Sequence, residues 1–181
     1  MARISTLTIN EAGDASETLI SVQEKIGMVP NIYASLAHSP ATLNALLGFN
    51  GALAEGALDA SLREQIALTI AGENNCDYCA SAHTLMAKAA GVSDVEATNN
   101  LSARSDNPAT AAILKFVKQI VVNRGFATDA EVAELRDAGI TDEQFVEILA
   151  HVGINLFANY FNNVIQTDID FPLVRAQKQA A

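Results

Sequence analysis

The sequence predicts an all-α fold, on the evidence of its composition and of a series of helix-start signals. The chain of 181 residues contains four prolines and no tryptophan, and it is rich in Ala, Leu, Glu and Gln, which favour helix over sheet. Half of its residues are apolar and 18% are charged, as in ordinary globular proteins that bury their own core. The length suits a single domain, which we expect to span residues 1–181.

The charge balance argues against two classes of partner. With 21 acidic and 11 basic residues the net charge is -10, which disfavours binding to nucleic acid and to anionic membrane surfaces. The opening "MARISTLTINEAGDAS" lacks the apolar segment of a signal peptide. The longest uncharged run, between Asn31 and Glu55, is too polar to span a bilayer. We therefore expect a cytoplasmic protein without nucleic-acid or membrane partners.

The N-terminal third carries signals for two helical regions. We expect a first helix over 16–26 and then a turn in "GMVPN", built on Gly27 and Pro30. Ser39 has the character of a helix cap, and Pro40 follows at the first helical position, where its missing N–H is not needed. Leucines at roughly helical intervals after Pro40 predict the second helical region.

A capping-box pattern, "SLRE" at 61–64, predicts a helix that starts at Ser61. Asn74 and Asn75 are suited to end that helix and to cap the next one. The body of this next helix, "CDYCASAHTLMAKAAG", is expected to stop at Gly91. The two cysteines of the chain then lie in its first turns.

The C-terminal half shows a linker and three further helices. "SARSDNPAT" at 102–110 is the best linker candidate, and "AAILKFVKQIVVNRG" predicts an amphipathic helix that ends at Gly125. Thr128 is expected to cap a short helix, and "TDEQ" at 141–144 is a second capping box that opens a long apolar helix. The tail after Asp170 has no regular pattern, and we expect it to be mobile.

The only two cysteines stand three positions apart, and a histidine follows four positions later. On a helix Cys76, Cys79 and His83 share one face. A purely structural disulfide is weakly motivated, because so short a loop gains only about 2 kcal/mol before strain. A zinc site is an alternative, but no fourth ligand is evident beside the two thiols and the imidazole. A redox dithiol fits best, because a helix N-terminus and a nearby imidazole both raise the thiolate fraction.

Glu64 has two interpretations. In its local sequence it is the third residue of a capping box, which is a structural role. It also lies one helix before the dithiol, from where a carboxylate could approach the cysteines and exchange protons. The local sequence favours the cap.

The segment "REQIALTIAGENNCDYCASAHTLMAKAAGVSD" at 63–94 resembles the signature of the alkylhydroperoxidase D and carboxymuconolactone decarboxylase superfamily. The redox-active branch of this superfamily has a glutamate twelve residues before a C-x-x-C pair and a histidine four residues after it. Four residues match that pattern position by position: Glu64, Cys76, Cys79 and His83. The flanking segments 27–53 and 156–172 also resemble peroxidase-related members, so the similarity covers most of the chain.

The resemblance implies an all-helical homo-oligomer, trimeric or hexameric, with no bound metal or organic cofactor. It implies a thiol peroxidase whose partners are a peroxide substrate and a dithiol reductant or redox-partner protein. Cys79 is then the residue that attacks the peroxide, and Cys76 is the resolving cysteine. Glu64 and His83 form the proton relay, which favours the catalytic interpretation of the glutamate.

One position departs from the pattern, because Tyr78 stands where alkylhydroperoxidase D has a histidine just before the second cysteine. A phenol does not titrate near neutrality, so this arm of the relay is in question. Two other functions remain open. One is a decarboxylase of the carboxymuconolactone type, although such enzymes do not rely on this cysteine pair. The other is a non-enzymatic redox sensor whose disulfide alters assembly.

Other candidate residues are assigned structural roles. We expect His38 and His151 to act as helix caps or partly buried structural residues. Tyr160 and Phe161, at helical spacing from Phe157 and Val164, are expected to lie in the core or in a subunit interface. None of these six residues is expected to take part in catalysis.

Overall fold

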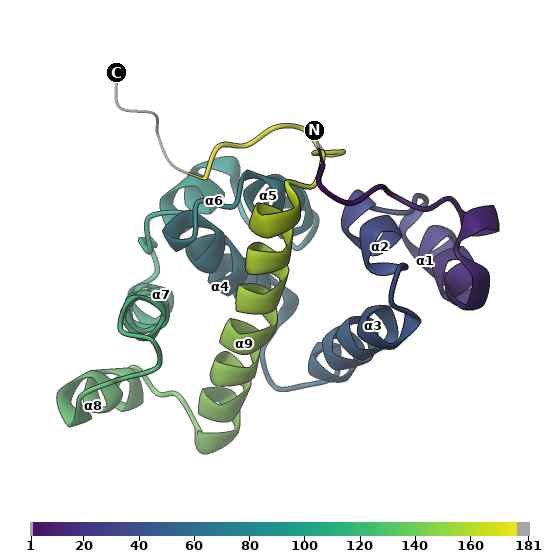
Figure 1. Cartoon of the computed structure of the whole chain (residues 1–181). Coiled ribbons are helices and arrows are strands. Elements are labelled where there is room, and N and C mark those ends of the chain that lie inside the picture. The colour runs from purple at the N-terminus through teal and green to yellow at the C-terminus, as the bar shows by residue number, and fades with distance from the viewer. Residues whose placement is uncertain (1, 177–181) are drawn as a thin grey trace.

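A computed structural model describes residues 2–176 and confirms the all-α prediction (Figure 1). No strand occurs within this range. Two 3-10 turns come first, η1 (Ile9–Glu11) and η2 (Gly13–Ala15). Nine α-helices follow among the described residues: α1 (Ser16–Ile26), α2 (Asn31–Leu36), α3 (Pro40–Ala54), α4 (Ala60–Glu73), α5 (Asp77–Ala89), α6 (Asp94–Asn100), α7 (Pro108–Val122), α8 (Asp129–Asp137) and α9 (Asp142–Ile165).

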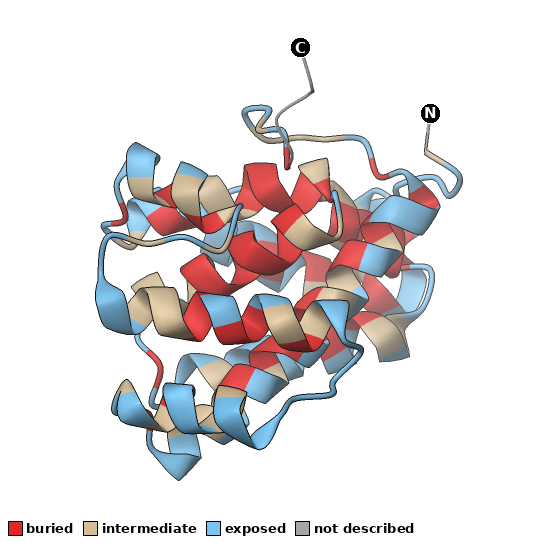
Figure 2. Ribbon diagram, turned by 90° about the vertical axis from the view of Figure 1, so that its left-hand side faces the viewer, coloured by how far each residue is buried: buried red, intermediate tan, exposed pale blue. Residues whose placement is uncertain are grey.

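Helix α4 forms the centre of the molecule. It packs against α5, α6, α7 and α9, and every residue from Gln65 to Gly72 is buried, as the red central helices of Figure 2 show. A helix that is apolar all round is expected to be surrounded by other elements. Gly72 is required at its end, because a Cβ atom there would lie 1.9 Å from the carbonyl oxygen of Leu101. Helix α4 therefore provides the fixed frame for the cysteine helix α5.

The long helix α9 lies along α4 and runs in the same direction. Near the start of α4, the Glu147 carboxylate accepts hydrogen bonds from the backbone N–H groups of Ala57 (2.8 Å) and Leu58 (3.0 Å). Near its end, the side chain of Asn74 donates to Asn159 Oδ1 at 3.3 Å. These bonds fix the register of the two helices, so one face of α9 is directed at α4 and at the start of α5.

Two large apolar clusters hold the helices together. One joins the N-terminal helices to the start of α5 and the end of α9, and it includes Leu19, Leu43 and Ile154. The other joins α4, α7, α8 and α9 around Ile66, Leu114 and Ile148. Each fully buried side chain of this size contributes about 1.5–3 kcal/mol. The cysteines belong to the first cluster.

Several predicted helix starts are confirmed. Helix α1 has the expected bounds, and the turn after it uses Gly27 at φ 86°. Ser39 caps α3, where its side chain accepts from the backbone N–H of Thr42. The capping boxes of Thr128 and Thr141 both form.

The predicted start of α4 is wrong. The helix begins at Ala60 and is capped by Asp59, whose Oδ1 accepts from the Leu62 N–H at 2.8 Å. Ser61 Oγ donates to the same carboxylate oxygen at 2.7 Å and is not the cap. Asp59 rather than Ser61 caps the helix because an ionised carboxylate is a stronger acceptor than a hydroxyl. The carboxylate of Glu64 is consequently not engaged in a capping box.

Other predicted boundaries shift by a few residues. Helix α5 is capped by Cys76 rather than by an asparagine. Helix α7 ends at Val122, before Gly125, and α5 ends at Ala89, before Gly91; both glycines have positive φ. Helix α6, just before the expected linker, was not predicted.

The expectation of a mobile tail after Asp170 is wrong for residues 171–176, and residues 177–181 lie outside the described range. The described segment is bonded to α5. Asp77 Oδ1 accepts from the backbone N–H of Ala176 at 2.9 Å, and Ser81 Oγ accepts from that of Val174 at 2.9 Å. The Phe171 ring stands edge-on to Tyr78, with centroids 5.6 Å apart. Tertiary contacts thus order a segment that has no local pattern.

None of the helices within residues 2–176 is both long and apolar enough to cross a membrane.

Candidate active site

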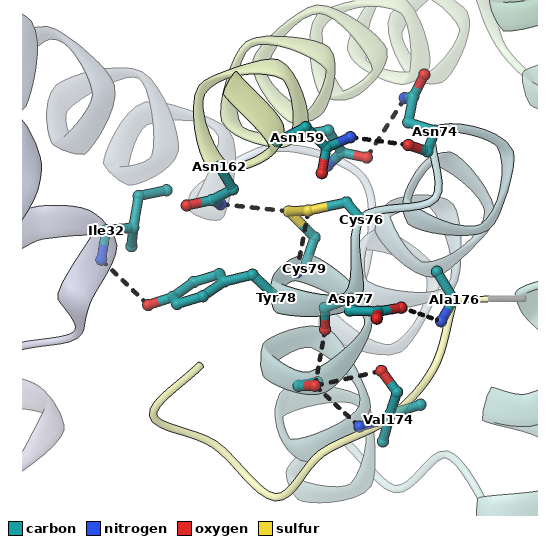
Figure 3. The surroundings of a disulfide bond; sticks show 12 residues. Ile32, Asn74, Cys76, Asp77, Tyr78, Cys79, Asn159, Asn162, Val174 and Ala176 are labelled. Atoms are coloured by element: carbon teal, nitrogen blue, oxygen red, sulfur yellow. Dashed lines mark hydrogen bonds between the residues drawn. A yellow bond between two sulfur atoms is a disulfide. The ribbon is translucent and has the colours of Figure 1, made fainter. Parts of the chain in front are cut away.

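Cys76 and Cys79 lie at the start of α5 and are joined by a disulfide bond (Figure 3). Their Cα atoms are 5.3 Å apart, a normal distance for a disulfide. Cys76 is the N-cap of the helix, and its Sγ accepts from the backbone N–H of Cys79 at 3.2 Å. The two residues are 0% and 2% exposed, so in this conformation both sulfur atoms are enclosed by protein.

The corner between α4 and α5 places Cys76 in the capping position. Asn75 adopts a left-handed conformation (φ 53°), its N–H donates to the Gly72 carbonyl, and the N–H of Cys76 donates to the Ala71 carbonyl at 3.0 Å. This is the Schellman arrangement, which satisfies the last carbonyls of a helix and reverses the chain. The end of α4 therefore determines where α5 starts and where its first sulfur lies.

Glu64 and His83 meet across the interface of α4 and α5. Glu64 Oε2 lies 2.7 Å from His83 Nδ1, and each side chain is 19% exposed. Free of a capping role, Glu64 instead orients the imidazole. A carboxylate bonded to one ring nitrogen fixes the orientation of the ring and leaves the other nitrogen for proton exchange.

The structure thus brings the four predicted residues to neighbouring turns of two packed helices. His83 follows Cys79 by four residues, one turn along the same face of α5. No hydrogen bond joins His83 to either sulfur within residues 2–176. The arrangement consists of a buried disulfide and, one turn away, a carboxylate and imidazole pair that solvent reaches.

Tyr78 points away from the sulfur atoms toward α2 (Figure 3). Its hydroxyl oxygen accepts a hydrogen bond from the backbone N–H of Ile32 at 3.1 Å. Burial raises the pKa of Tyr78 far above its ordinary value, so the phenol stays neutral throughout the physiological range. Tyr78 anchors α5 to α2 and does not replace a titrating histidine.

Sequence reasoning missed a polar row on the buried face of α9. The row comprises His151, Asn155, Asn159 and Asn162, all of them buried. The side chain of Asn162 donates from Nδ2 to Cys79 Sγ at 3.4 Å, which makes it a direct contact of the candidate nucleophile. A signal was present in the sequence, because these spacings place four polar residues on one face of an apolar helix.

The two remaining histidines occupy different environments. His38 is exposed, and its Nε2 lies 3.0 Å from the Ser5 carbonyl, which is a structural contact. His151 is 6% exposed, and its Nε2 has no hydrogen-bond partner within residues 2–176. Burial, reinforced by the charge of Arg63, lowers the pKa of His151. The imidazole is therefore held in its neutral form.

The aromatic residues of α9 divide between core and surface. Phe161 packs against the N-terminal cluster, as expected for a core residue. Phe157, Tyr160 and Val164 are 41%, 57% and 59% exposed, so of the two expected locations, core or subunit interface, they do not lie in the core of the single chain. An interface role for these three residues remains a prediction.

Two other kinds of site, a metal site and a pocket away from the cysteines, have less support. Within the described range, no group of three or more His, Cys, Asp or Glu side chains is placed to hold a metal ion. A pocket of about 570 Å³ lies away from the cysteines, beside the starts of α4, α6 and α7. Three of its polar lining residues, Asp59, Ser93 and Asn107, are the N-caps of these helices. Helix capping explains much of its polarity, and the dithiol remains the best candidate site.

A family comparison points to the same helices. Residues 40–121 match the model of the carboxymuconolactone decarboxylase family, a span that contains α3 to α6, all of α7 except Val122, and all four predicted site residues. A search of the curated proteins finds no match.

Solved structures extend the similarity to nearly the whole chain. An uncharacterized peroxidase-related protein with an alkylhydroperoxidase AhpD core, from Ralstonia eutropha JMP134, is 26% identical with a TM-score of 0.85, over 93% of this chain and 92% of that one. A peroxidase-related protein from Silicibacter sp. TM1040 is 21% identical with a TM-score of 0.77, over 86% and 84%. The debrominase Bmp8, solved alone and with 2,3,4-tribromopyrrole, is 20% identical with a TM-score of 0.79, over 92% and 91%. The last two similarities establish a shared fold.

Proposed function

Since the chain belongs to the alkylhydroperoxidase D and carboxymuconolactone decarboxylase superfamily, in its peroxidase-related branch, we propose that it is a cysteine-based hydroperoxide reductase. One observation carries the proposal: the only two cysteines reach disulfide distance within one turn of α5, with the Glu64 and His83 pair one turn further on. A dithiol beside a proton-exchanging pair has the groups that peroxide reduction needs.

In the first half-reaction the Cys79 thiolate attacks one oxygen of a hydroperoxide. A sulfur–oxygen bond forms, the oxygen–oxygen bond breaks, and the sulfur is oxidised by two electrons to a sulfenic acid. The leaving alkoxide takes up a proton and departs as an alcohol. The pair of Glu64 and His83 supplies that proton and recovers one from solvent, to which both side chains are partly open. The N-terminus of α5 favours the thiolate form of Cys79.

In the second half-reaction Cys76 resolves the sulfenic acid. Its sulfur attacks Cys79 Sγ, a disulfide forms, and the sulfenic oxygen leaves as water. The distance of 5.3 Å between the two Cα atoms allows this bond without rearrangement of the helix start. An external dithiol or a redox-partner protein then reduces the disulfide by thiol exchange. The reductant is itself oxidised to a disulfide, and Cys76 and Cys79 return to thiols.

Steady-state turnover separates this function from its two alternatives. The reduced protein is given cumene hydroperoxide and an excess of a dithiol, and peroxide loss is followed. A peroxidase consumes many equivalents per chain, whereas a redox sensor consumes one and stops. A decarboxylase of the carboxymuconolactone type consumes none. A single equivalent consumed, or no loss of peroxide above that of a Cys76→Ser, Cys79→Ser double variant, overturns the proposal.

We also propose that the protein works in the cytoplasm as a homo-oligomer, a trimer or hexamer. Helix α9 presents an exposed apolar face that supports self-association: Val146, Leu149, Phe157, Tyr160 and Val164. These residues recur at helical spacing on the side of α9 opposite the buried polar row. A second copy of the chain would cover a face that a monomer leaves in water. Sedimentation equilibrium of the wild type and of Tyr160→Glu tests this assembly.

A further inference from the structure

The buried polar row of α9 is unusual in its placement and in its cost. Its members, His151, Asn155, Asn159 and Asn162, lie within an arc of about 80° around the helix. Their exposed fractions are 6%, 7%, 0% and 3%. Buried amides lose their hydration, and each unpaired polar atom costs about 1–3 kcal/mol. The bonds that each member makes therefore indicate what the row does.

Two of the asparagines make bonds within the scaffold. The side chain of Asn155 donates to the carbonyl of His151 at 2.9 Å, one turn earlier in the same helix. Asn159 accepts from the side chain of Asn74, which ties α9 to the end of α4. Both bonds join parts of the framework and involve no reactive group.

Asn162 differs, because its partner is a sulfur atom. Its Nδ2 donates to Cys79 Sγ at 3.4 Å, across 83 positions of sequence (Figure 3). Asn162 Oδ1, on the same amide, is buried without a partner in the described part of the chain. The side chain is held between α9 and the start of α5, so the donor stays directed at the sulfur.

The two sulfur atoms consequently have different donors. Cys76 Sγ accepts the backbone N–H of Cys79, as a helix cap does. Cys79 Sγ accepts the side-chain amide of Asn162. Helix position alone favours the cap residue as the more acidic thiol, because it lies nearer the terminus. The amide of Asn162 offsets this preference and acts on Cys79 only.

We propose that Asn162 is a positioning residue that stabilises the thiolate form of Cys79 and thereby makes Cys79 the attacking cysteine. A hydrogen bond to an anion is stronger than one to a neutral sulfur, and the enclosed site strengthens it further. The amide therefore favours ionisation of the thiol. The catalytic consequence rests on the proposed peroxidase function, but the effect on thiol ionisation does not.

The free oxygen of the same amide supports this role. The hydroperoxide oxygen that the sulfur attacks carries its own O–H donor, because the alkoxide is the leaving group. With its N–H committed to the sulfur, Asn162 leaves Oδ1 as an acceptor for that O–H. One side chain can thus hold both the nucleophile and the substrate in register.

The test uses the full chain with Cys76 changed to serine, so that Cys79 is the only thiol. The rate of alkylation by iodoacetamide is measured from pH 5 to 10 with Asn162 intact and after Asn162→Ala. Loss of the hydrogen bond from Asn162 to the Cys79 thiolate is expected to move the midpoint of the rate profile upward by roughly one pH unit. At a given pH below the midpoint, the thiolate fraction of Cys79 is then about tenfold lower. Asn155→Ala, a buried asparagine on the same face, is the matched control and is expected to leave the midpoint in place.

Two further measurements keep the result unambiguous. Asn162→Leu is nearly isosteric, removes the donor without adding a charge, and is expected to move the midpoint in the same direction; it replaces the alanine variant if that variant does not fold. An unchanged midpoint in a folded Asn162 variant, or an equal shift in Asn155→Ala, overturns the inference. If the midpoint shifts as expected while the wild type shows no peroxide turnover, the inference stands and the proposed peroxidase function fails.

Discussion

Glu64 Oε2 lies 2.7 Å from His83 Nδ1, across the interface between α4 and α5. The carboxylate therefore holds the imidazole, and the start of α4 is secured by Asp59. Of the two roles that the sequence offered for Glu64, the helix cap thus belongs to Asp59. The proposed relay role of Glu64 can therefore be tested by mutation without loss of the helix cap.

Glu64→Gln is expected to lower peroxidase turnover at least about tenfold, because an amide neither gains nor loses a proton in this pH range. Its thermal unfolding is expected to stay near that of the wild type, because the cap is elsewhere. His83→Gln is expected to show a comparable loss of turnover. Initial rates across pH 6 to 9 and thermal unfolding of each variant provide the measurement.

Asp59→Ala is the matched control for Glu64→Gln. Loss of this cap is expected to cost about 0.5–2 kcal/mol of stability and to leave the turnover of the folded protein unchanged. If Glu64→Gln keeps full turnover over the whole pH range, the carboxylate has no part in proton transfer.

The cysteines are expected to respond differently to serine. Cys79→Ser should abolish peroxide consumption, because it removes the attacking sulfur. Cys76→Ser should let a sulfenic acid accumulate at Cys79, because the resolving partner is gone. Dimedone labelling followed by peptide mass spectrometry locates the sulfenic acid. A label on Cys76 in the Cys79→Ser variant, with none on Cys79 in the converse variant, reverses the assignment.

Tyr78→Phe is expected to affect stability more than chemistry. The change leaves the buried N–H of Ile32 without its acceptor, which costs about 1–3 kcal/mol. Because burial raises the pKa of Tyr78 far above neutrality, its removal should leave the shape of the pH–rate profile between pH 6 and 9 unchanged. Urea unfolding and pH–rate profiles test the two parts separately. A lost or displaced limb of the profile would assign the phenol a role in proton transfer.

Stability is expected to fall as the pH drops below about 6.5, partly through His151. Burial and the nearby charge of Arg63 lower the pKa of His151 in the folded protein below its ordinary value of 6.5. The unfolded chain therefore takes up the proton first, and the free energy of unfolding decreases from about pH 6.5 down through the folded pKa. His151→Gln should flatten this part of the curve, measured by urea unfolding at several pH values. His38→Gln, which removes an exposed imidazole, is the control, and an equal flattening there would contradict the assignment.

The fold class and the residues of the motif could be predicted because their signals are local. Helical spacing put both cysteines and His83 on one face, and the expected capping box at Thr141 and the expected cap at Thr128 both formed. The start of α4 was mispredicted because two capping residues, Asp59 and Ser61, overlap, and only the structure shows which one accepts the bond.

The rest of the site depends on tertiary packing. Asn162 reaches Cys79 only because α9 lies along α4 with its buried face toward α5. The ordered segment 171–176 likewise depends on bonds to Asp77 and Ser81, far away in sequence. No local pattern encodes such contacts, although the spacing of the three asparagines was visible and could have directed attention to this face of α9.

The most direct measurement of the central claim is a count of free thiols in the fully reduced protein before and after one equivalent of hydroperoxide. We expect two thiols per chain before treatment and none after it, with a mass lower by two hydrogen atoms and Cys76 linked to Cys79 in a single tryptic peptide. Two thiols that persist, or a disulfide found only between subunits, would contradict it.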